Sequence, residues 1–565
     1  MTNYRLLKTL SDKEKIELSD YSSLQQQLLI NRDIKTATEA ERFLNPSFAE
    51  ELNDPWLMPD MKKAVKRILK AIKDDEKVTI FSDYDCDGIP GAVILHDFFK
   101  AVGFHNFVNY IPHRHYEGFG FSQEAAEKIS TDQSTLVITI DCGTTSVEAV
   151  EKANELGLDV IITDHHEAGS QLPPAVAIVN PKIGDSYPFP YLCGAGVVYK
   201  LVQALLEEGD FELKTGWEKW WLDMVGLATV ADMVPLTGEN RVLAKYGLDV
   251  LRKSRRPGLQ QLLRKQRVDQ RTLTEEDIGF TIGPRINAAS RMDTPEDAFH
   301  MLATTDEGEA GARVDHLESL NTKRKTTVAL MTKEIHKRMK ELIEVPAVIV
   351  LGNPNWRPSL VGLSAGKLAD EFGKPAFIWG RDGNGIIKGS CRSGGQISVV
   401  KLMEEVSGSL IEHGGHHFSG GFSVLESEIH TLPMILNKAY EKLGEESLVS
   451  EELAVDTVVR LEDIDNQFIN DQKSLAPFGV DNPKPVYLIE NITAVSVDLF
   501  GKTKEHTKLV FNTTGLVREA IAFFRSFDTF TKTPEIGKSV SLLCHLEQSY
   551  FMGRLQTRLR IIDII

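Results

Sequence analysis

The chain has 565 residues, of which 42% are hydrophobic and 26% are charged, and its formal net charge is −17. At ~150 residues per domain, this length predicts three or four domains of an ordinary globular protein. No run approaches the ~18 apolar residues of a membrane helix, and the start lacks the plan of a signal peptide, so we expect a cytoplasmic protein without a membrane partner. Five cysteines without a C-x-x-C pair exclude a disulfide framework and disfavour a zinc knuckle.

The negative net charge disfavours non-specific binding to a polyanion, but it does not decide the question. Residues 251–271 carry eight basic residues and one acid, a composition found most often on a solvated helical face and also in nucleic-acid contacts. Clustered carboxylates that bind metal would add to the formal charge without repelling phosphate. Composition therefore leaves nucleic acid open as a partner.

In chain order, residues 1–50 are polar and predict helices, and residues 61–72 have helical spacing with Asp60 as the predicted N-cap. Short apolar runs then alternate with helical patterns, which indicates a parallel α/β sheet with both faces covered. The predicted strands are 78–81, 107–112, 135–141 and 159–166, and the predicted helices between them are 91–103, 122–129 and 146–157.

Residues 220–236 predict an apolar helix that ends at Asp232, and residues 312–344 predict one long connecting helix. A second, glycine-rich α/β region runs from 346 to about 430. The tail contains short strands separated by turn residues, which favours a small barrel, with an OB-fold as the first interpretation. The predicted divisions of the chain are 1–50, 51–240, 241–340, 341–450 and 451–565.

Acidic side chains gather where the predicted strands end. They are Asp83, Asp85 and Asp87 after the first strand, Asp141 after the third, Asp164 with His165 and His166 after the fourth, and Asp232 at a helix end. Like charges this close repel each other and raise each other's pKa, so their crowding needs a cause. Because the carboxyl ends of parallel strands meet at one edge of a sheet, we expect the strand-end groups to converge there, and Asp232 could join them.

A divalent cation is the cause that this pattern favours. Several aspartate oxygens and one imidazole suit Mn²⁺ or Mg²⁺, and the imidazole tilts the choice toward Mn²⁺. Two ions ~4 Å apart would activate a water and steady the leaving oxygen of a phosphoester. A single strand-end aspartate is more often a helix cap or a turn residue, and paired histidines more often pack or lie on the surface. The coincidence of all these groups at one edge is what favours the metal site.

Eight sequence motifs resemble a known family. "SDYDCDG" (82–88), "TIDCG" (139–143), "TDHHE" (163–167) and "VADMVPL" (230–236) resemble, in this order, the four motifs of the DHH phosphoesterase superfamily. "GPRINAASRM" (283–292), "GSCRS" (389–393) and "GGHHFSGGF" (414–422) resemble later motifs of its single-strand-specific exonuclease branch, the RecJ nucleases. "LAPFGVDNPKPVY" (475–487) is similar to the start of that branch's OB-fold.

The resemblance implies a fold class and a reaction. The fold would be α/β, with a parallel-sheet DHH domain and a smaller, glycine-rich DHH-associated domain joined by a long helix, followed by a C-terminal β-barrel OB-fold. The reaction would be the 5′-to-3′ hydrolysis of single-stranded DNA to mononucleotides with two Mn²⁺ or Mg²⁺ ions, in DNA repair and recombination. Single-stranded DNA with a 5′ end would be the substrate. A RecQ-type helicase and a single-strand-binding protein are the protein partners that follow from this reading, and the chain would act as a monomer.

The motif match also implies roles for individual residues. The metal shell would consist of Asp83, Asp85, Asp87, Asp141, His165 and Asp232, and which of the first three bind metal directly stays open. Asp164 would orient His165, and His166 would face the scissile phosphate, so Asp141, Asp164 and His166 form the expected catalytic set. The substrate phosphates would be held by Arg114, Arg285, Asn287, Arg291, Ser390, Arg392 and His416. Arginine forks fit phosphate bidentately, although an arginine can equally form a structural ion pair.

Three departures from the family pattern are visible. Ser419 and Gly420 stand where paired alanines are common, and the small size is kept. Cys86 stands where alanine is usual, between two predicted ligands, so thiol oxidation or capture of zinc could inhibit the enzyme. Pro358 and Ser359 stand where glycine is usual, which leaves the backbone path there open.

Two alternative functions remain. A DHH phosphodiesterase that acts on short oligonucleotides or cyclic dinucleotides would share the metal motifs but needs no third domain. The tail supplies basic and aromatic residues for a strand-binding platform, and a dimerisation barrel is the competing interpretation of this tail. These residues are Lys502, Lys504, Lys508, Arg554, Arg558, Arg560, Phe500, Phe511 and Tyr550. A non-catalytic scaffold is disfavoured because every ligand position is filled.

Overall fold

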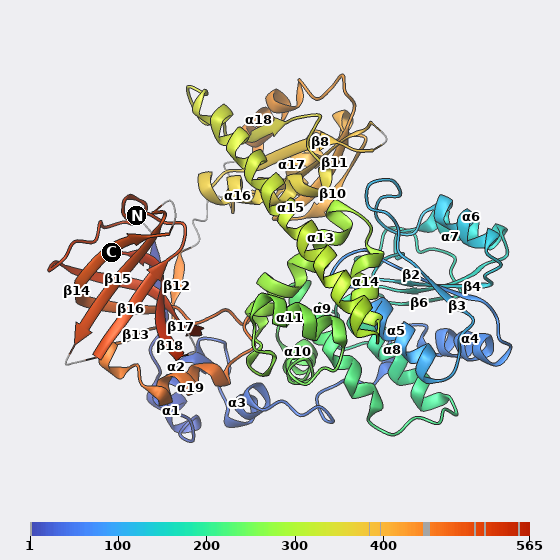
Figure 1. The fold of residues 1–565 in the computed structure, drawn as a ribbon, viewed down its shortest axis with the longest axis horizontal. Coiled ribbons are helices and arrows are strands. Elements are labelled where there is room, and N and C mark those ends of the chain that lie inside the picture. The colour runs from blue at the N-terminus through green and yellow to red at the C-terminus, as the bar shows by residue number, and fades with distance from the viewer. Residues whose placement is uncertain are drawn as a thin grey trace. The chain divides into compact units, whose positions relative to one another are not determined.

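A computed structural model of the chain describes residues 3–383, 385–395, 397–443, 452–501, 504–513, 516–551 and 554–565. The chain forms two compact units, shown in Figure 1: residues 50–449 make one, and residues 1–49 together with 450–565 make the other. Within the described residues, no helix is long and apolar enough to cross a membrane.

A five-stranded parallel sheet positions the acidic residues. Its order is β3 (Phe107–Tyr110), β2 (Val78–Ser82), β4 (Leu136–Ile140), β5 (Asp159–Thr163) and β6 (Ala177–Val179). All five residues of β2 and of β4 are buried, as continuously apolar strands require. One face is covered by α6 (Gln123–Thr131) and α7 (Val147–Glu155), and the other by α4 (Met61–Lys73), α5 (Gly88–Ala101) and α8 (Gly194–Glu208) (Figure 1).

The four predicted strands and the helices between them are confirmed, while β6 was not predicted from the sequence. The predicted cap of α4 is wrong in its chemistry. Asp60 holds the N-cap position, but it has a left-handed backbone with φ 54° and makes no side-chain cap. Its carboxylate instead accepts a hydrogen bond from the Ile178 N–H on β6, so this residue fastens the helix to the unpredicted strand.

Helices connect the parallel sheet to the glycine-rich region. They are α9 (Leu222–Ala231), α10 (Gly238–Leu251), α11 (Pro257–Gln266), α13 (Gly283–Met292), α14 (Glu296–Ala303) and α15 (Glu307–Lys340). The predicted long helix is confirmed as α15, whose 34 residues span roughly 50 Å. Its first half packs on α11, α13 and α14, and its second half packs on the next domain through Val328, Ile335 and Met339. One helix thus links the cores of both α/β domains.

The glycine-rich domain is a mixed sheet in the order β10, β11, β9, β8, β7. Its elements are β7 (Ile349–Gly352), α16 (Pro358–Phe372), β8 (Ala376–Arg381), β9 (Ile387–Arg392), α17 (Val399–Glu405), β10 (Glu412–His416), β11 (Ser419–Val424) and α18 (Leu432–Leu443). Only β7 and β8 run parallel, and the remaining pairs are antiparallel.

The C-terminal strands form the predicted barrel. They are β12 (Leu453–Val455), β13 (Thr457–Val458), β14 (Tyr487–Phe500), β15 (His506–Thr513), β16 (Leu516–Ala522), β17 (Ser539–Phe551) and β18 (Arg554–Ile564), with α19 (Asn466–Ser474) before β14. Neighbours pair in the order β14, β15, β16, β18, β17, and a further pairing of β17 with β14 closes the barrel. Its interior is apolar, with Leu509, Leu542 and Leu559 almost completely buried.

The N-terminal segment belongs to the barrel unit, which the sequence did not predict. The segment contains β1 (Tyr4–Leu6), α1 (Asp12–Glu17), α2 (Ser23–Ile30) and α3 (Ala37–Leu44). Strand β1 pairs with β12, and Leu28 and Leu29 of α2 share a core with Leu475. Arg32 fixes this contact: its Nε donates to Asn482 Oδ1 at 2.7 Å, one Nη donates to the Pro483 carbonyl at 2.6 Å, and the other lies 3.6 Å from Asp456.

We therefore expect Arg32→Met to destabilise the barrel unit by about 2–4 kcal/mol, because Asp456 and the side-chain carbonyl of Asn482 lose their buried partner. Amide hydrogen exchange along β14 and β17 measures this as lost protection. Lys13→Met, at an exposed position of α1, is the control and should leave exchange unchanged. Unaltered protection in the Arg32 variant would show that the segment does not support the barrel.

Candidate active site

Two helix N-termini hold the triple-aspartate loop that follows β2. Asp85 Oδ1 accepts hydrogen bonds from the N–H groups of Asp87 at 2.8 Å and Gly88 at 3.2 Å, so it caps α5. The Asp87 carboxylate accepts from the N–H groups of Gly194 at 2.6 Å and Ala195 at 2.7 Å, at the start of α8. These positive helix ends offset part of the carboxylate charge.

Glycine provides the room for this packing. A Cβ at Gly88 would lie 2.6 Å from the Asp83 carbonyl oxygen, and a Cβ at Gly194 would lie 2.6 Å from the Asp141 Cβ. Any larger residue would push the helix ends away from the aspartates. At Gly88 and Gly194 the neighbouring chain approaches the backbone so closely that only glycine fits.

The predicted ligands do converge. His165 Nε2 lies 3.1 Å from Asp141 Oδ1, 3.6 Å from Asp87 Oδ2 and 3.7 Å from Asp232 Oδ2. A second group consists of Asp83, Asp85 and Asp141, and the ligand atoms within each group lie within 4.8 Å of one another. Asp141 stands beside both groups, as expected for a carboxylate between two metal positions.

Asp164 orients a different histidine from the one we predicted. Its Oδ1 lies 2.7 Å from His166 Nδ1, whereas it reaches His165 only through the backbone N–H at 2.7 Å. Its Oδ2 accepts from the Thr144 N–H at 2.9 Å. The ring of His165 instead turns to the aspartates, because consecutive residues after β5 direct their side chains to different sides. Asp164 therefore fixes His166 directly and His165 through the backbone.

Nearby positive groups offset only part of the carboxylates' charge. Burial, followed by repulsion from neighbouring aspartates, raises the pKa of Asp83 and Asp141, the pKa of Asp87 to about 7 and the pKa of Asp232 to about 9. Among the residues that the structure describes, the buried Oδ1 atoms of Asp83 and Asp141 have no hydrogen-bond partner. Orphaned, crowded oxygens of this kind are what a divalent cation requires, so the residues fit Mn²⁺ or Mg²⁺.

The pKa values of the two histidines are shifted in opposite directions. Burial, reinforced by the charge of His166, lowers the pKa of His165 to about 3, so this ring is neutral and able to bind metal. Burial alone would lower the pKa of His166 as well, but the hydrogen bond and charge of Asp164 outweigh it and raise the pKa. His166 is thus the more readily protonated of the pair.

Three arginines at the predicted phosphate site carry an excess of positive charge. The Arg114 guanidinium lies 4.7 Å from the centre of the Tyr84 ring. Arg291 donates to the Ser359 carbonyl at 2.6 Å, and burial, followed by the charge of Arg114, lowers its pKa to about 9. Across the described part of the chain, no carboxylate forms an ion pair with Arg114, Arg291 or Arg392. An anionic ligand would complete this cluster.

The glycine-rich sheet places the remaining predicted residues on neighbouring strands. In the sheet register, Ser419 of β11 stands opposite both His416 of β10 and Arg392 of β9. Ser390 and Arg392 face α16, where a Cβ at Gly362 would lie 3.3 Å from Ser390 Oγ and 3.4 Å from Arg392 Nη2. His416 is exposed. The register therefore brings Arg392 and His416 to one part of the sheet.

Arg285 and Asn287 are turned to protein partners rather than to an open cleft. Arg285 is buried and donates to Glu318 at 2.6 Å, to the Thr281 carbonyl at 2.7 Å and to Gln266. Asn287 Oδ1 accepts from the Cys86 N–H at 3.0 Å. Their contacts tie α13 to α15 and to the triple-aspartate loop, so in this structure both residues position the site.

The packing of α13 on the triple-aspartate loop also encloses the Cys86 side chain. A Cβ at Gly283 of α13 would lie 3.7 Å from its Sγ, and its residual exposure is 3%. Burial, followed by the charge of Asp85, raises the pKa of the Cys86 thiol. A buried, protonated thiol is a poor target for oxidants and a poor ligand for zinc, which argues against the inhibition that the sequence suggested.

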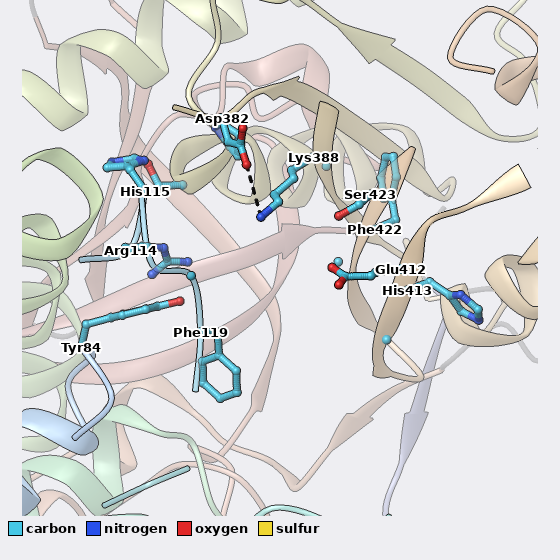
Figure 2. A pocket seen from close by; sticks show the side chains of 16 residues that line it. Tyr84, Arg114, His115, Phe119, Asp382, Lys388, Glu412, His413, Phe422 and Ser423 are labelled. Carbon is cyan, nitrogen blue, oxygen red and sulfur yellow. Dashed lines mark ion pairs between the residues drawn. The ribbon is translucent and has the colours of Figure 1, made fainter. Parts of the chain in front are cut away.

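A cavity of about 510 Å³ opens between the two α/β domains (Figure 2). One wall comes from the loops after β2 and β3 and includes Tyr84, Arg114 and Phe119. The other comes from the glycine-rich sheet and includes Lys388, paired with Asp382 at 3.3 Å, and Glu412. The Phe119 ring lies 5.9 Å from the His166 ring, so the cavity begins beside the metal centre. Of these lining residues, the sequence predicted Arg114 and missed Tyr84, Phe119, Lys388 and Glu412. The position of Tyr84 between Asp83 and Asp85 is the one signal that could have indicated it.

Comparison with known proteins finds the three domains that the sequence predicts: a DHH domain, a DHH-associated domain and an OB-fold. Residues 77–229 match the DHH family, N-terminal domain, residues 344–443 the DHHA1 domain, and residues 455–563 the RecJ OB domain. The single-stranded-DNA-specific exonuclease RecJ of Dickeya dadantii is 30% identical over 421 residues, which cover 72% of each protein. The chain belongs to the RecJ family. The RecJ exonuclease of Bacillus subtilis is 37% identical over 88% of this chain, which spans 62% of that protein's length.

A solved structure of a RecJ relative is similar in fold to this chain. The crystal structure of RecJ from Thermus thermophilus in complex with Mn²⁺ matches with a TM-score of 0.83 and 25% identity, over all of this chain and 79% of that one. The sequence-based expectation of two α/β domains, a long helix and an OB-fold barrel is confirmed.

The raised carboxyl pKa values predict how stability depends on pH. Folded Asp87 and Asp232, with pKa values of about 7 and about 9, retain protons that an unfolded Asp, with a pKa of ~3.9, has released. The folded state binds more protons, so stability is fully present at low pH and is lost as pH rises through these values, by about 1 kcal/mol per pH unit. We expect the Tm in EDTA to fall between pH 6 and pH 9 and Mg²⁺ to raise the Tm most at the upper end.

Scanning fluorimetry in EDTA and in Mg²⁺ measures both effects. Asp232→Asn should flatten the fall in EDTA and reduce the Mg²⁺ response, whereas Asp185→Asn, at an exposed position, should change neither. A Tm in EDTA that rises with pH would contradict the assigned charge deficit.

Proposed function

We propose that the chain is an exonuclease that degrades single-stranded DNA from the 5′ end and releases 5′-mononucleotides with two Mn²⁺ or Mg²⁺ ions. The observation that carries this proposal is the convergence of His165 with Asp87, Asp141 and Asp232 beside a cavity lined by arginine. Membership of the RecJ family supports it.

The donor groups divide between two metal positions. Asp83, Asp85 and Asp141 would hold one ion, and Asp87, Asp232 and His165, with Asp141 beside them, the other. When bound, the ions would activate water and stabilise the leaving oxygen. The chain's own contribution is to keep His165 neutral and to fix the aspartates with the N-termini of α5 and α8.

His166 would donate a hydrogen bond to the scissile phosphate. Asp164 raises its pKa and holds Nδ1, which leaves Nε2 to donate to a phosphate oxygen. A preorganised donor of this kind stabilises the charge that develops on phosphorus-bound oxygens without reorganisation. Asp164 acts through His166 and is a positioning residue.

The arginine cluster accounts for the 5′ polarity. Arg114 lines the cavity beside the metal centre and Arg291 lies close behind it, while Ser390, Arg392 and His416 lie on the glycine-rich sheet. A terminal phosphate held between these walls places the next linkage at the metal centre. Arg285 and Asn287 contribute by positioning α13 and the aspartate loop.

The barrel would bind the single-stranded DNA beyond its terminal nucleotide, although fewer barrel residues suit this role than the sequence predicted. Phe511 is buried in the barrel core, and Lys508 and Arg558 both pair with Glu519, so these contribute little free charge. Arg560 lies 4.1 Å over Phe523, next to exposed Phe524. Arg560 with these rings is the better candidate for base stacking. Lys502 and the side chains of Tyr550 and Arg554 lie outside the described residues, and Phe500 and Lys504 stay predictions.

Further parts of the proposal rest on the family. They are a cytoplasmic location, action as a monomer in repair and recombination, and partnership with a RecQ-type helicase and a single-strand-binding protein. The alternative, a phosphodiesterase of short oligonucleotides or cyclic dinucleotides, explains the metal centre but gives the barrel no role. A scaffold without activity does not explain a complete ligand set.

The first test is degradation of 5′-phosphorylated, 3′-labelled single-stranded DNA in Mn²⁺. The wild type should shorten the strand from its 5′ end, and Asp141→Ala should lose at least ~100-fold in rate because both metal groups lose an oxygen. Asp185→Ala is the matched control, since Asp185 is exposed on the same domain. Cleavage of a dinucleotide with no action on the strand would favour the alternative.

A second test separates phosphate recognition from metal binding. Arg392→Ala should reduce the preference for a 5′-phosphate over a 5′-hydroxyl by about tenfold, while the Mn²⁺ dependence of Tm stays unchanged, because Arg392 touches no metal ligand. Arg392→Lys keeps the charge without the fork and should be intermediate. Equal loss of metal binding and end preference would refute this role.

A further inference from the structure

One wall of the cavity carries a carboxylate that the reaction described above does not use. Glu412 begins β10 and lines the cavity, and over the described residues it forms no ion pair. Its carboxylate points toward the wall that bears Arg114 and Phe119, whereas the ring of His413 points away, as neighbours on a strand do (Figure 2). A free acid is out of place in a site for a polyanion unless it faces something other than phosphate.

Among the described residues, no ion pair joins Glu412 to Lys388 of the same wall. Lys388 is held by Asp382 at 3.3 Å, and Figure 2 marks this pair. On the opposite wall, Arg114 stacks over Tyr84, 4.7 Å from its ring centre, beside the metal centre. Glu412 therefore presents an open acceptor to the cavity.

The cavity has the size and the walls for a nucleoside. Its volume of about 510 Å³ falls within the ~300–1,000 Å³ of small-ligand sites. Phe119 is 59% exposed there and offers a ring for stacking. Because the cavity begins beside His166, a strand whose first linkage lies at the metal centre places its terminal nucleoside in this space.

A carboxylate discriminates between bases because it only accepts hydrogen bonds. Guanine offers two adjacent N–H donors, which a carboxylate can bind with both oxygens, and adenine and cytosine each offer one amino group. Thymine offers a single N–H flanked by two carbonyl oxygens, which repel the acid. The expected order is guanine first, adenine and cytosine next, and thymine last.

We propose that Glu412 reads the base of the 5′-terminal nucleotide and makes the enzyme release amino-bearing bases, guanine above all, faster than thymine. This inference rests on the proposed function, since it assigns the terminal nucleoside to the cavity. Glu412 is a specificity residue here, and the metal centre does not depend on it.

The test compares 5′-phosphorylated strands that differ only in the terminal base, deoxyguanosine or deoxyinosine, which lacks the 2-amino group. First-nucleotide release in Mn²⁺ should give a kcat/KM about tenfold higher for deoxyguanosine with the wild type. Glu412→Gln should bring this ratio to about twofold or less, because the amide offers a single oxygen, while release of terminal thymidine is retained. Glu404→Gln, an exposed glutamate on α17, is the matched control and should keep the wild-type ratio.

The outcomes separate the two proposals. Equal rates for all terminal bases with the wild type would overturn the base-reading role while leaving the exonuclease intact. A uniform increase for all bases in Glu412→Gln would also overturn it, because simple repulsion of phosphate would then explain Glu412. Absence of release from every strand would overturn the proposed function and this inference with it. An unchanged Mn²⁺-dependent Tm shift confirms that the variant is folded.

Discussion

Repulsion among buried carboxylates is the constraint on which this site depends. The parallel sheet brings Asp83, Asp87 and Asp141 to one edge, where each is almost completely buried. Helix N-termini and a neutral His165 reduce the cost, but two buried oxygens still have no partner. A bound cation would supply the missing partner, and the stability that repulsion costs the free protein would then appear as affinity for metal.

The arginines beside the metal centre carry positive charge that is not fully offset, just as the aspartates carry negative charge that is not fully offset. Arg291 is half-buried next to Arg114, and burial, followed by the charge of Arg114, lowers its pKa to about 9, so a bound anion would stabilise its charged form. The two clusters offset each other only in part: Arg114 acts to lower the pKa of Asp83 and Asp85 acts to raise the pKa of Arg291, but in both cases burial outweighs the attraction. A DNA phosphate that contacts both metal and guanidinium would satisfy both at once. Substrate binding and metal binding should thus reinforce each other.

The sequence predicted the chemistry that backbone topology determines. Asp141, His165 and Asp232 converge because strand and helix ends place them, so their spacing along the chain was sufficient. It did not predict contacts that depend on side-chain direction, such as Arg285 turning to Glu318. Nor did it predict the long-range pairing of residues 1–49 with the barrel, because polar helices carry no signal for their partner. Glu412 was missed for a similar reason: a single acid on a glycine-rich strand has no periodic pattern.

In the glycine-rich sheet, the residues that pack the core differ from the residue that would contact the substrate. A Cβ at Gly389 would lie 2.2 Å from the Phe422 ring, so the sheet needs glycine to pack its core at the point where the cavity opens. The core on this side is carried by residues such as Cys391 and Phe422, whereas Glu412 projects from an exposed edge strand. Substitution at the edge leaves the core untouched. A substitution of Glu412 should therefore leave the metal centre, which stands on a different sheet, intact.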